Sequence, residues 1–288
     1  MKKFTFRKIT NKKQKMETKL EKNFFEFERF IRRFEPNLWI FPYITGLLLF
    51  ITLILCYLVT SFVQGYPVFW LVSDVAASSP VSGYFSQSMD LIAILAILSV
   101  YLRCKQIEYY LKEIIPESKN QQVNNPEMIR ILNEKNYQSF NCAILSSIGF
   151  MILGNFDSFE HLIGHFFGVA LLFTTIPFLL AQKYIAEKLY ECDQIEYRPT
   201  MLTIITYTVA IGWPLISSIF ACSLIMNGSI FDWFDQNLRL YWPSDSPSFY
   251  LYRFGVILEW LVIISYSPML FIISNRMKLF KYWNRIVY

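Results

Sequence analysis

The side chains of this sequence with the greatest capacity for chemistry are a few ionisable residues inside or beside long apolar segments. If these segments cross a membrane, a charge within them costs free energy and tends to be retained for function. The residues inside the segments are Asp90, His161, His165 and Glu259, and those in adjoining polar links are Asp74, Asp157 and Glu160. All fall toward matching ends of their segments, so we expect them on one side of the membrane.

Four of these residues, Asp74, Asp90, His165 and Glu259, form a candidate polar cluster. Carboxylates beside a histidine can exchange protons with a lipid headgroup. They can also bind a divalent ion, although two histidines without a close spacing partner are a weak metal signal. Finally, they can hydrogen-bond a polar link to the helix ends and fix that face of the protein. We predict this structural use, with headgroup binding and catalysis as alternatives, and we expect no metal.

The composition is typical of a polytopic membrane protein. The chain has 288 residues, of which 54% are hydrophobic and 17% charged, whereas about a quarter of the residues in soluble domains are charged. The sequence holds no Gly-rich phosphate loop, no Gly-x-Ser-x-Gly and no His-Glu-x-x-His, which are motifs of common catalytic and cofactor sites. We therefore expect no cofactor, and we favour a protein that is not an enzyme.

The apolar segments predict an all-α protein with six transmembrane helices, near residues 39–63, 84–102, 137–154, 161–182, 199–226 and 254–274. Each is close to or above the roughly 20 residues that a bilayer requires. Gly164 and Gly168 stand four apart in the fourth segment, a spacing that lets a neighbouring helix approach closely. The chain then divides into a basic arm over 1–38, a membrane domain over 39–278 and a basic tail over 279–288.

Lysine and arginine are distributed very unevenly among the polar segments. The amino-terminal arm, the loops after the second and fourth spans, and the tail together hold 25 of the 27. The positive-inside rule therefore places both termini and these two loops in the cytosol. The hairpin over 68–85, the link over 155–160 and the loop over 227–253 would then face the lumen or the exterior.

The basic arm predicts a contact with lipid. Twelve basic residues stand there against five glutamates, and Phe24, Phe27, Ile31 and Phe34 recur at helical spacing. We predict a cytosolic amphipathic helix on the anionic inner leaflet, whose lipids are the expected partners, with a purely topological role as the alternative. The basic residues are not interleaved with aromatic ones as in nucleic-acid-binding segments, so no nucleic-acid partner is expected.

The hairpin and second span resemble the damage-regulated autophagy modulator (DRAM) family, whose signature there is Pro-x-Ile-Ser-Asp-Thr-Gly-x-x-Pro-Pro-Glu-Ser followed by Tyr-x-Arg. The chain departs from the family at Val75, Ala76, Val81, Asp157 and Asp90. The resemblance covers roughly residues 37–280. The residues that carry it are Val72-Ser73-Asp74, Pro80, Ser82, Tyr101-Leu102-Arg103, Gly154-Asn155-Phe156, His165 and Glu259-Trp260.

The resemblance implies a lysosomal, other endomembrane or plasma-membrane protein with a role in autophagy. The wider superfamily also includes lipid-remodelling factors of GPI anchors and proteins that position a phosphatidylinositol 4-kinase. The resemblance implies that Ser73, Asp74, Pro80 and Asn155 belong to the functional face, together with the polar cluster.

These observations lead to three functional hypotheses. The first is a non-enzymatic membrane regulator similar to DRAM proteins, acting through lipids or through protein partners that the sequence does not identify. The second is a lipid-remodelling enzyme or factor on the lumenal side, which requires Asp74, His165 and Glu259 to converge around a lipid-sized cleft. The third is a transporter or channel, which we disfavour because no series of charges runs through the membrane thickness.

Overall fold

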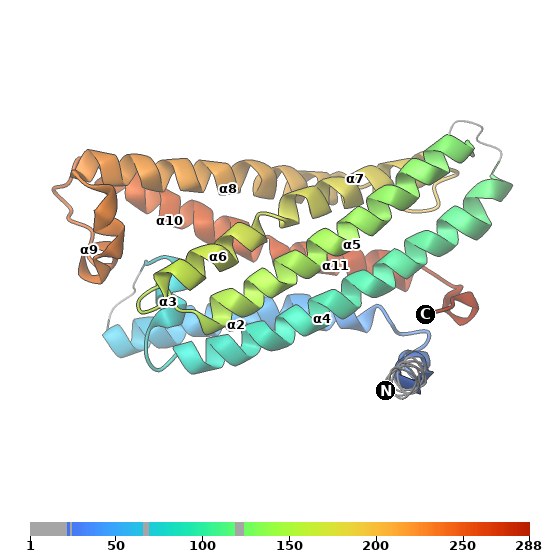
Figure 1. Ribbon diagram of the computed structural model, residues 1–288, viewed down its shortest axis with the longest axis horizontal. Coiled ribbons are helices and arrows are strands. Elements are labelled where there is room, and N and C mark those ends of the chain that lie inside the picture. The colour runs from blue at the N-terminus through green and yellow to red at the C-terminus, as the bar shows by residue number, and fades with distance from the viewer. Residues whose placement is uncertain (1–21, 24, 66–68, 119–123) are drawn as a thin grey trace, which may run out of the picture.

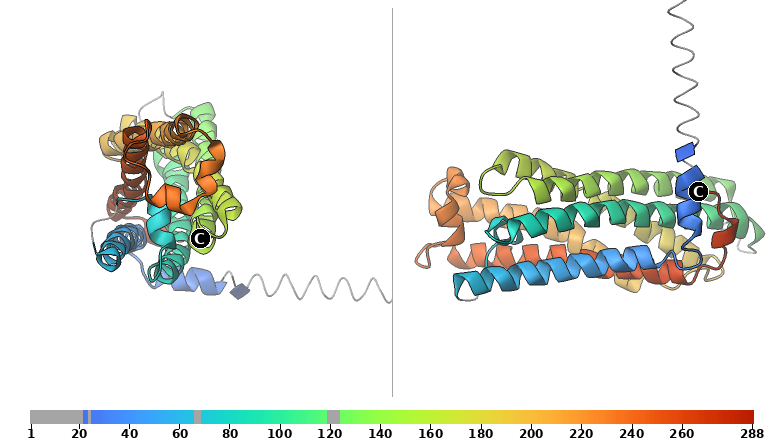
Figure 2. Two further views of the ribbon diagram at one scale, coloured as in Figure 1. Left: turned by 90° about the vertical axis from the view of Figure 1, so that its left-hand side faces the viewer. Right: turned by 90° about the horizontal axis from the view of Figure 1, so that it is seen from below.

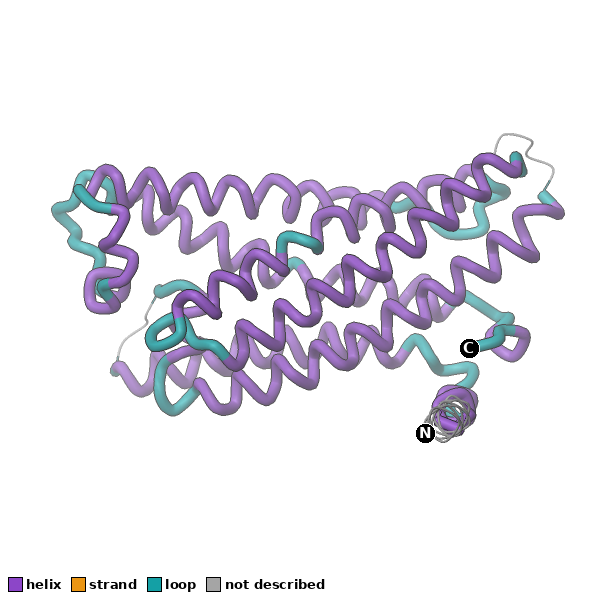
Figure 3. Tube along the Cα trace, viewed as in Figure 1, coloured by secondary structure: helices purple, strands orange, loops and turns teal. Residues whose placement is uncertain are grey.

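The computed structural model describes residues 22–23, 25–65, 69–118 and 124–288, and in these residues the chain forms helices and loops without a strand (Figure 3). A short amino-terminal helix over 25–32 precedes the labelled elements. The labelled elements are α2 (Ile40–Gln64), α3 (Val72–Ala77), α4 (Ser82–Tyr109), η1 (Tyr110–Ile114), η2 (Ile115–Glu117), α5 (Pro126–Asn155), α6 (Leu162–Leu172), α7 (Thr175–Glu191), α8 (Thr200–Asn227), η3 (Ile230–Phe234), α9 (Gln236–Leu240), α10 (Phe249–Ile264), α11 (Tyr266–Lys278) and η4 (Trp283–Arg285).

The long helices run side by side along the longest axis of the molecule and form one elongated bundle (Figures 1 and 2). Short elements gather at the end that carries α3 and α9, which we call the hairpin end. The helix over 25–32 and the carboxyl terminus lie at the opposite end, which we call the terminus end. The all-α prediction is therefore confirmed for the described residues.

Within the described residues, five helical segments are long and apolar enough to cross a membrane, and α5 is not among them, so the predicted sixth span stays a prediction. The polar side chains of α5 include Gln138 and Asn141, which are exposed, and serines that pair inside the bundle. Ser139 accepts a hydrogen bond from Gln182 of α7 at 3.0 Å, and Ser146 contacts Thr175 at 3.4 Å. The five segments are Ile40–Gln64, Ser82–Glu117, Leu162–Glu191, Thr200–Asn227 and Phe249–Lys278.

Glycines allow a close helix contact between α5 and α6. A Cβ at Gly149 would lie 2.9 Å from the Gly168 carbonyl oxygen, and one at Gly164 would lie 2.7 Å from the Phe156 ring. Both values are below the normal contact distance, so the two helices pack at this spacing because these side chains are absent. The predicted role of Gly164 and Gly168 is confirmed.

The amino-terminal helix lies across the long axis of the bundle, next to the carboxyl-terminal residues (Figure 2). Ile31 is buried, while Phe25 and Phe30 are exposed. The predicted face also included Phe24, which lies outside the described residues, and Phe27 and Phe34, which are exposed. The tail folds back against this helix, because the Tyr288 hydroxyl donates to Glu35 at 3.1 Å.

Candidate functional site

Asp74 lies in α3 at the hairpin end and has no exposed surface. Its Oδ1 accepts a hydrogen bond from the Ser158 hydroxyl at 2.8 Å and lies 3.3 Å from Nη2 of Arg239. Burial raises the pKa of Asp74 above its ordinary value, and the Arg239 guanidinium and the Ser158 hydroxyl offset this only in part. Asp74 therefore joins α3 to the link before α6 and to α9, both of which follow much later in the chain.

Arg239 is the functional residue that the sequence did not reveal. Its side chain is buried, its Nη2 donates to the Ser158 carbonyl at 2.9 Å, and its guanidinium lies 5.6 Å from the ring centroids of both Phe159 and Trp233. The Tyr252 hydroxyl donates to the Arg239 carbonyl at 3.0 Å and fixes the backbone. The available signal was an arginine, one of two in the loop over 227–253, between aromatic residues, because a buried charge needs a buried partner.

Two neighbouring residues of α10 hold the start of α3. Glu259 Oε2 accepts a hydrogen bond from the Val72 backbone N–H at 3.0 Å, and the Trp260 indole N–H donates to the Trp70 carbonyl at 2.9 Å. The amide of Val72 opens a helix and has no partner within it, so Glu259 satisfies a group that would otherwise be orphaned. The hairpin is thus fixed to α10 by side chains that lie 187 and 190 residues further along the chain.

His165 of α6 is oriented by the loop before it. Its Nδ1 lies 2.9 Å from the Phe156 carbonyl oxygen. A carbonyl can only accept, so Nδ1 carries the hydrogen and Nε2 is left as an acceptor. Nε2 has no partner among the described residues.

The remaining predicted site residues lie apart from this group. Asn155 donates to Asp90 Oδ1 at 2.8 Å and accepts from Ser86 at 3.0 Å, in a partly exposed contact between α4 and α5. Pro80 is exposed in the turn before α4. It does not open that helix, which begins at Ser82.

A pocket of about 410 Å³ lies between α5, α6, α8 and α10 at the hairpin end. Its inner wall is mostly apolar and aromatic, with Phe150, Leu172 and Trp213 among the lining side chains. The polar lining residues are Ser73, Ser158, His165, Ser217, Arg239 and Glu259. His165 and Glu259 therefore line one pocket together with Ser73. Asp74, which the second hypothesis also placed at the cleft, does not line the pocket and instead contacts Ser158 and Arg239, which do. Asp90, Asn155 and Pro80 do not line it.

We infer that the pocket opens sideways, between α6 and α8, because exposed side chains of both helices line it. Phe166 is 44% exposed and Phe234 is 63% exposed, and both also line the pocket. On α8, Ser217 and Ala221 stand one turn apart, are exposed, and line the same opening. These two small side chains leave room at the mouth that a larger residue would fill.

Ser73, His165 and Glu259 do not form a catalytic relay. Glu259 bonds to a backbone amide and His165 to a backbone carbonyl, and within the described residues no hydrogen bond joins these side chains to one another or to the Ser73 hydroxyl. A serine nucleophile needs a base within hydrogen-bond reach. The arrangement therefore offers polar groups for binding rather than an assembled nucleophile.

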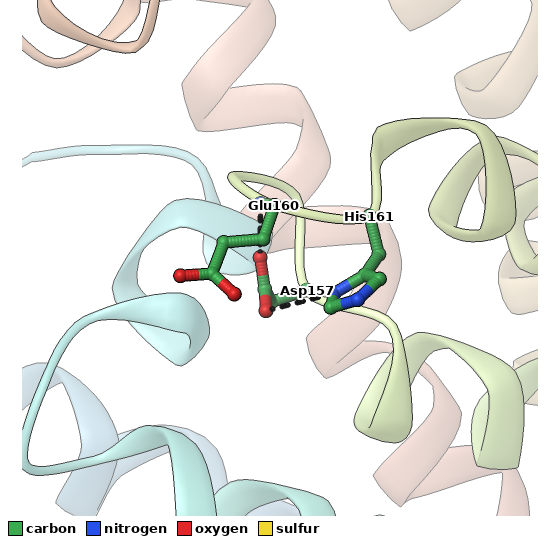
Figure 4. A group of neighbouring side chains, drawn as sticks. All are labelled: Asp157, Glu160 and His161. Carbon is green, nitrogen blue, oxygen red and sulfur yellow. Dashed lines mark hydrogen bonds and ion pairs between the residues drawn. The ribbon is translucent and has the colours of Figure 1, made fainter.

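A second acidic group surrounds the link before α6 (Figure 4). Ligand atoms of Asp157, Glu160 and His161 lie within 4.8 Å of one another. Asp157 Oδ1 accepts from the backbone N–H groups of Phe159 at 2.8 Å and Glu160 at 2.6 Å, and its Oδ2 lies 3.5 Å from His161 Nδ1. The carboxylate is thus the acceptor that shapes this turn, which accounts for the grouping of the three residues.

The terminus end contains a buried ionic triad that sequence reasoning identified only in part. Glu196 pairs with Arg103 of α4, with 2.9 Å between Oε2 and Nη2, and with Arg276 of α11. Burial alone would raise the pKa of Glu196, but the two guanidinium groups outweigh it and hold the pKa below the ordinary value of 4.5. Arg103 belongs to the Tyr-x-Arg segment of the resemblance, whereas Glu196 in its short loop gave no signal.

The fold and the site together define a multi-pass membrane protein with a ligand-sized pocket at one end of the bundle. Residues 37–275 match the family described as the Frag1/DRAM/Sfk1/Cwh43P N-terminal domain. The chain belongs to this family, and the resemblance inferred from the hairpin is confirmed. No curated protein and no solved structure matches the chain.

Proposed function

We propose that this protein is a non-enzymatic membrane regulator that acts by holding a lipid in the pocket at the hairpin end. The observation that carries the proposal is the mouth of the pocket, which lies between α6 and α8, two helices in segments apolar enough to cross a membrane. A ligand that enters there comes from the bilayer. The volume of about 410 Å³ suits a small molecule or one chain of a lipid.

The hydrogen bonds around the pocket support a role without catalysis. The ionisable groups Asp74, Arg239 and Glu259 are all used to fix the hairpin to the bundle. A pocket with a fixed polar wall suits a bound ligand that reports on membrane composition. On the strength of the family, we propose that the protein takes part in autophagy and resides in the lysosomal or the plasma membrane.

The topology that we propose has six spans with both termini in the cytosol, so that the hairpin end faces the lumen or the exterior. The helix over 25–32 and the carboxyl terminus lie at the same end of the bundle (Figure 1), which supports an even number of crossings. The basic arm would then lie on the anionic cytosolic leaflet.

The proposal is tested by closing the mouth of the pocket with Ser217→Trp. Ser218→Trp is a matched control, since both serines are exposed on α8 and each donates to the carbonyl four residues before it, at 3.0 and 2.9 Å. Only Ser217 lines the pocket. We expect Ser217→Trp to lower the lipid that co-purifies with the protein about tenfold and Ser218→Trp to leave it unchanged, by quantitative mass spectrometry. Equal lipid content in both variants would contradict the proposal.

The second candidate is a lipid-remodelling enzyme, which is favoured by the convergence of Ser73, His165 and Glu259 on one pocket. It requires the serine and the histidine to meet once a lipid is bound. The test is incubation of the purified protein with acyl-labelled phospholipids. Turnover that is lost in His165→Ala would establish the enzyme and end the non-enzymatic proposal, and we expect none.

A further inference from the structure

The unpaired polar atoms of the pocket include both acceptors and donors. Glu259 uses Oε2 for the Val72 amide and has no second partner within the described residues, so Oε1 is free. His165 offers Nε2, and the Ser73 hydroxyl has no side-chain or backbone partner in the described part of the chain. Arg239 Nε and Trp233 Nε1 are buried donors without a partner there. Such a mixture selects a ligand group that both donates and accepts hydrogen bonds, because a buried polar atom left unpaired costs free energy.

The charge of the pocket wall also selects the ligand. Arg239 is the cation that lines the pocket, and it is already paired with Asp74 at 3.3 Å. Among the described lining residues, no unpaired cation is then left for a phosphate, and an unbalanced charge in a site of low dielectric costs much free energy. A hydroxyl group meets no such penalty.

We infer that the pocket takes an uncharged lipid whose polar end carries hydroxyl groups, with its acyl chain directed toward Phe150, Leu172 and Trp213. The inference rests on the proposed function, because it names the class of lipid for the same pocket. The hydroxyl end would donate to His165 Nε2 and exchange hydrogen bonds with Glu259 Oε1 and Ser73. The acyl chain would lie between α5 and α8, with its far end at the mouth by Ser217 and Ala221.

The test uses two lipids that differ only in the phosphate, monooleoylglycerol and oleoyl lysophosphatidic acid. Full-length protein is placed in nanodiscs, because detergents are themselves single-chain amphiphiles. A diazirine-bearing monooleoylglycerol is crosslinked to the protein, and each unlabelled lipid is titrated as a competitor. We expect monooleoylglycerol to compete at least tenfold better than the lysophosphatidic acid, with the crosslinked peptides mapping to α6, α8 and α10.

Two variants test the assignment of the polar end. His165→Phe removes the free Nε2, so competition by monooleoylglycerol should weaken about threefold. Ser73→Ala should weaken the competition by monooleoylglycerol about threefold. Ser79→Ala is the control, because Ser79 is exposed and does not line the pocket. The comparison of two lipids on unaltered protein does not depend on how well either variant folds.

The outcomes separate this inference from the proposed function. Equal or stronger competition by lysophosphatidic acid would overturn the preference for an uncharged lipid. If Ser217→Trp still abolishes that competition, the pocket remains a lipid site. If neither lipid competes and crosslinking is unaffected by Ser217→Trp, both the inference and the proposed function fail.

Discussion

At the scale of single residues, Asp74 and Arg239 matter most, because each buried charge depends on the other. The carboxylate is fully buried and has one oxygen, Oδ2, without a partner, and Nε of Arg239 is likewise unpaired. Burial of both charges is tolerated only while they remain together, and removal of one partner of such a pair costs about 3–5 kcal/mol. The pair therefore stabilises the hairpin end.

We expect Asp74→Asn and Arg239→Met each to destabilise the protein by about 3 kcal/mol, and the double variant to recover part of the loss because neither charge is left alone. Asp90→Asn is the control, since Asp90 bonds Asn155 in a partly exposed contact, and it should cost less than about 1 kcal/mol. The measurement is unfolding in mixed micelles. Additive losses in the double variant would show that the two side chains do not act as a pair.

At the scale of elements, the triad at the terminus end joins α4, the loop after α7 and α11. Glu196 accepts from both Arg103 and Arg276, and Gln106 donates to the Arg276 carbonyl at 3.1 Å. The triad fixes the cytosolic ends that we propose for these helices, so it should control how firmly α11 is held against α4.

The triad makes a pH-dependent contribution to stability. The pKa of Glu196 is lower in the folded protein than its ordinary value of 4.5, so the contribution is fully present above pH 4.5. It is lost as the pH falls through the folded pKa, which lies below 4.5, because the unfolded state binds the proton more readily there. Melting temperatures from pH 7 to pH 3 should drop more steeply below pH 4.5 in the parent than in Glu196→Gln. Parallel curves would contradict this.

Element α5 should cross the membrane in spite of its polar residues, because Ser139 and Ser146 are paired inside the bundle. The two ends of α5 then lie on opposite sides. In intact cells, a membrane-impermeant maleimide should label Glu160→Cys and leave Glu127→Cys unlabelled. Both residues are exposed, and labelling of the parent chain is measured as the blank. Labelling of both positions would place α5 on one side of the membrane.

At the scale of the whole molecule, the bundle has two ends of different character. The hairpin end holds the pocket and the Asp74–Arg239 pair, while the terminus end holds the transverse helix, the tail and the loops rich in lysine and arginine (Figure 2). This polarity suits a protein that binds one lipid from one leaflet and contacts anionic lipids of the other.

The basic arm should bind anionic vesicles through charge. A peptide of residues 1–38 should float with vesicles containing phosphatidylserine at 0.05 M salt and be released at 1 M, where the Debye length falls to about 3 Å. Vesicles of phosphatidylcholine alone are the control and should bind weakly at both concentrations. Binding that is unchanged by salt would rule out an electrostatic contact.

The sequence determined the class of this protein and the approximate positions of its long apolar segments, and it named His165 and Glu259, which line the pocket. Asp74 and Asp90, which it named with them, do not line the pocket. The class and the positions follow from local properties, namely the length of apolar runs, helical spacing, the bias of lysine and arginine, and a short motif around Asp74. The Gly164 and Gly168 contact was likewise predictable, because a spacing of four places both residues on one helix face.

Only the tertiary structure decided which charges pair and where the pocket opens. Arg239 meets Asp74, and Glu196 meets Arg103 and Arg276, across long separations in the chain. No local pattern encodes such pairs, because the free energy of a buried charge depends on what the folded bundle brings beside it. The mouth beside Ser217 is decided in the same way, since a small residue on a helix becomes an opening only when the packing of the neighbouring helices leaves space in front of it.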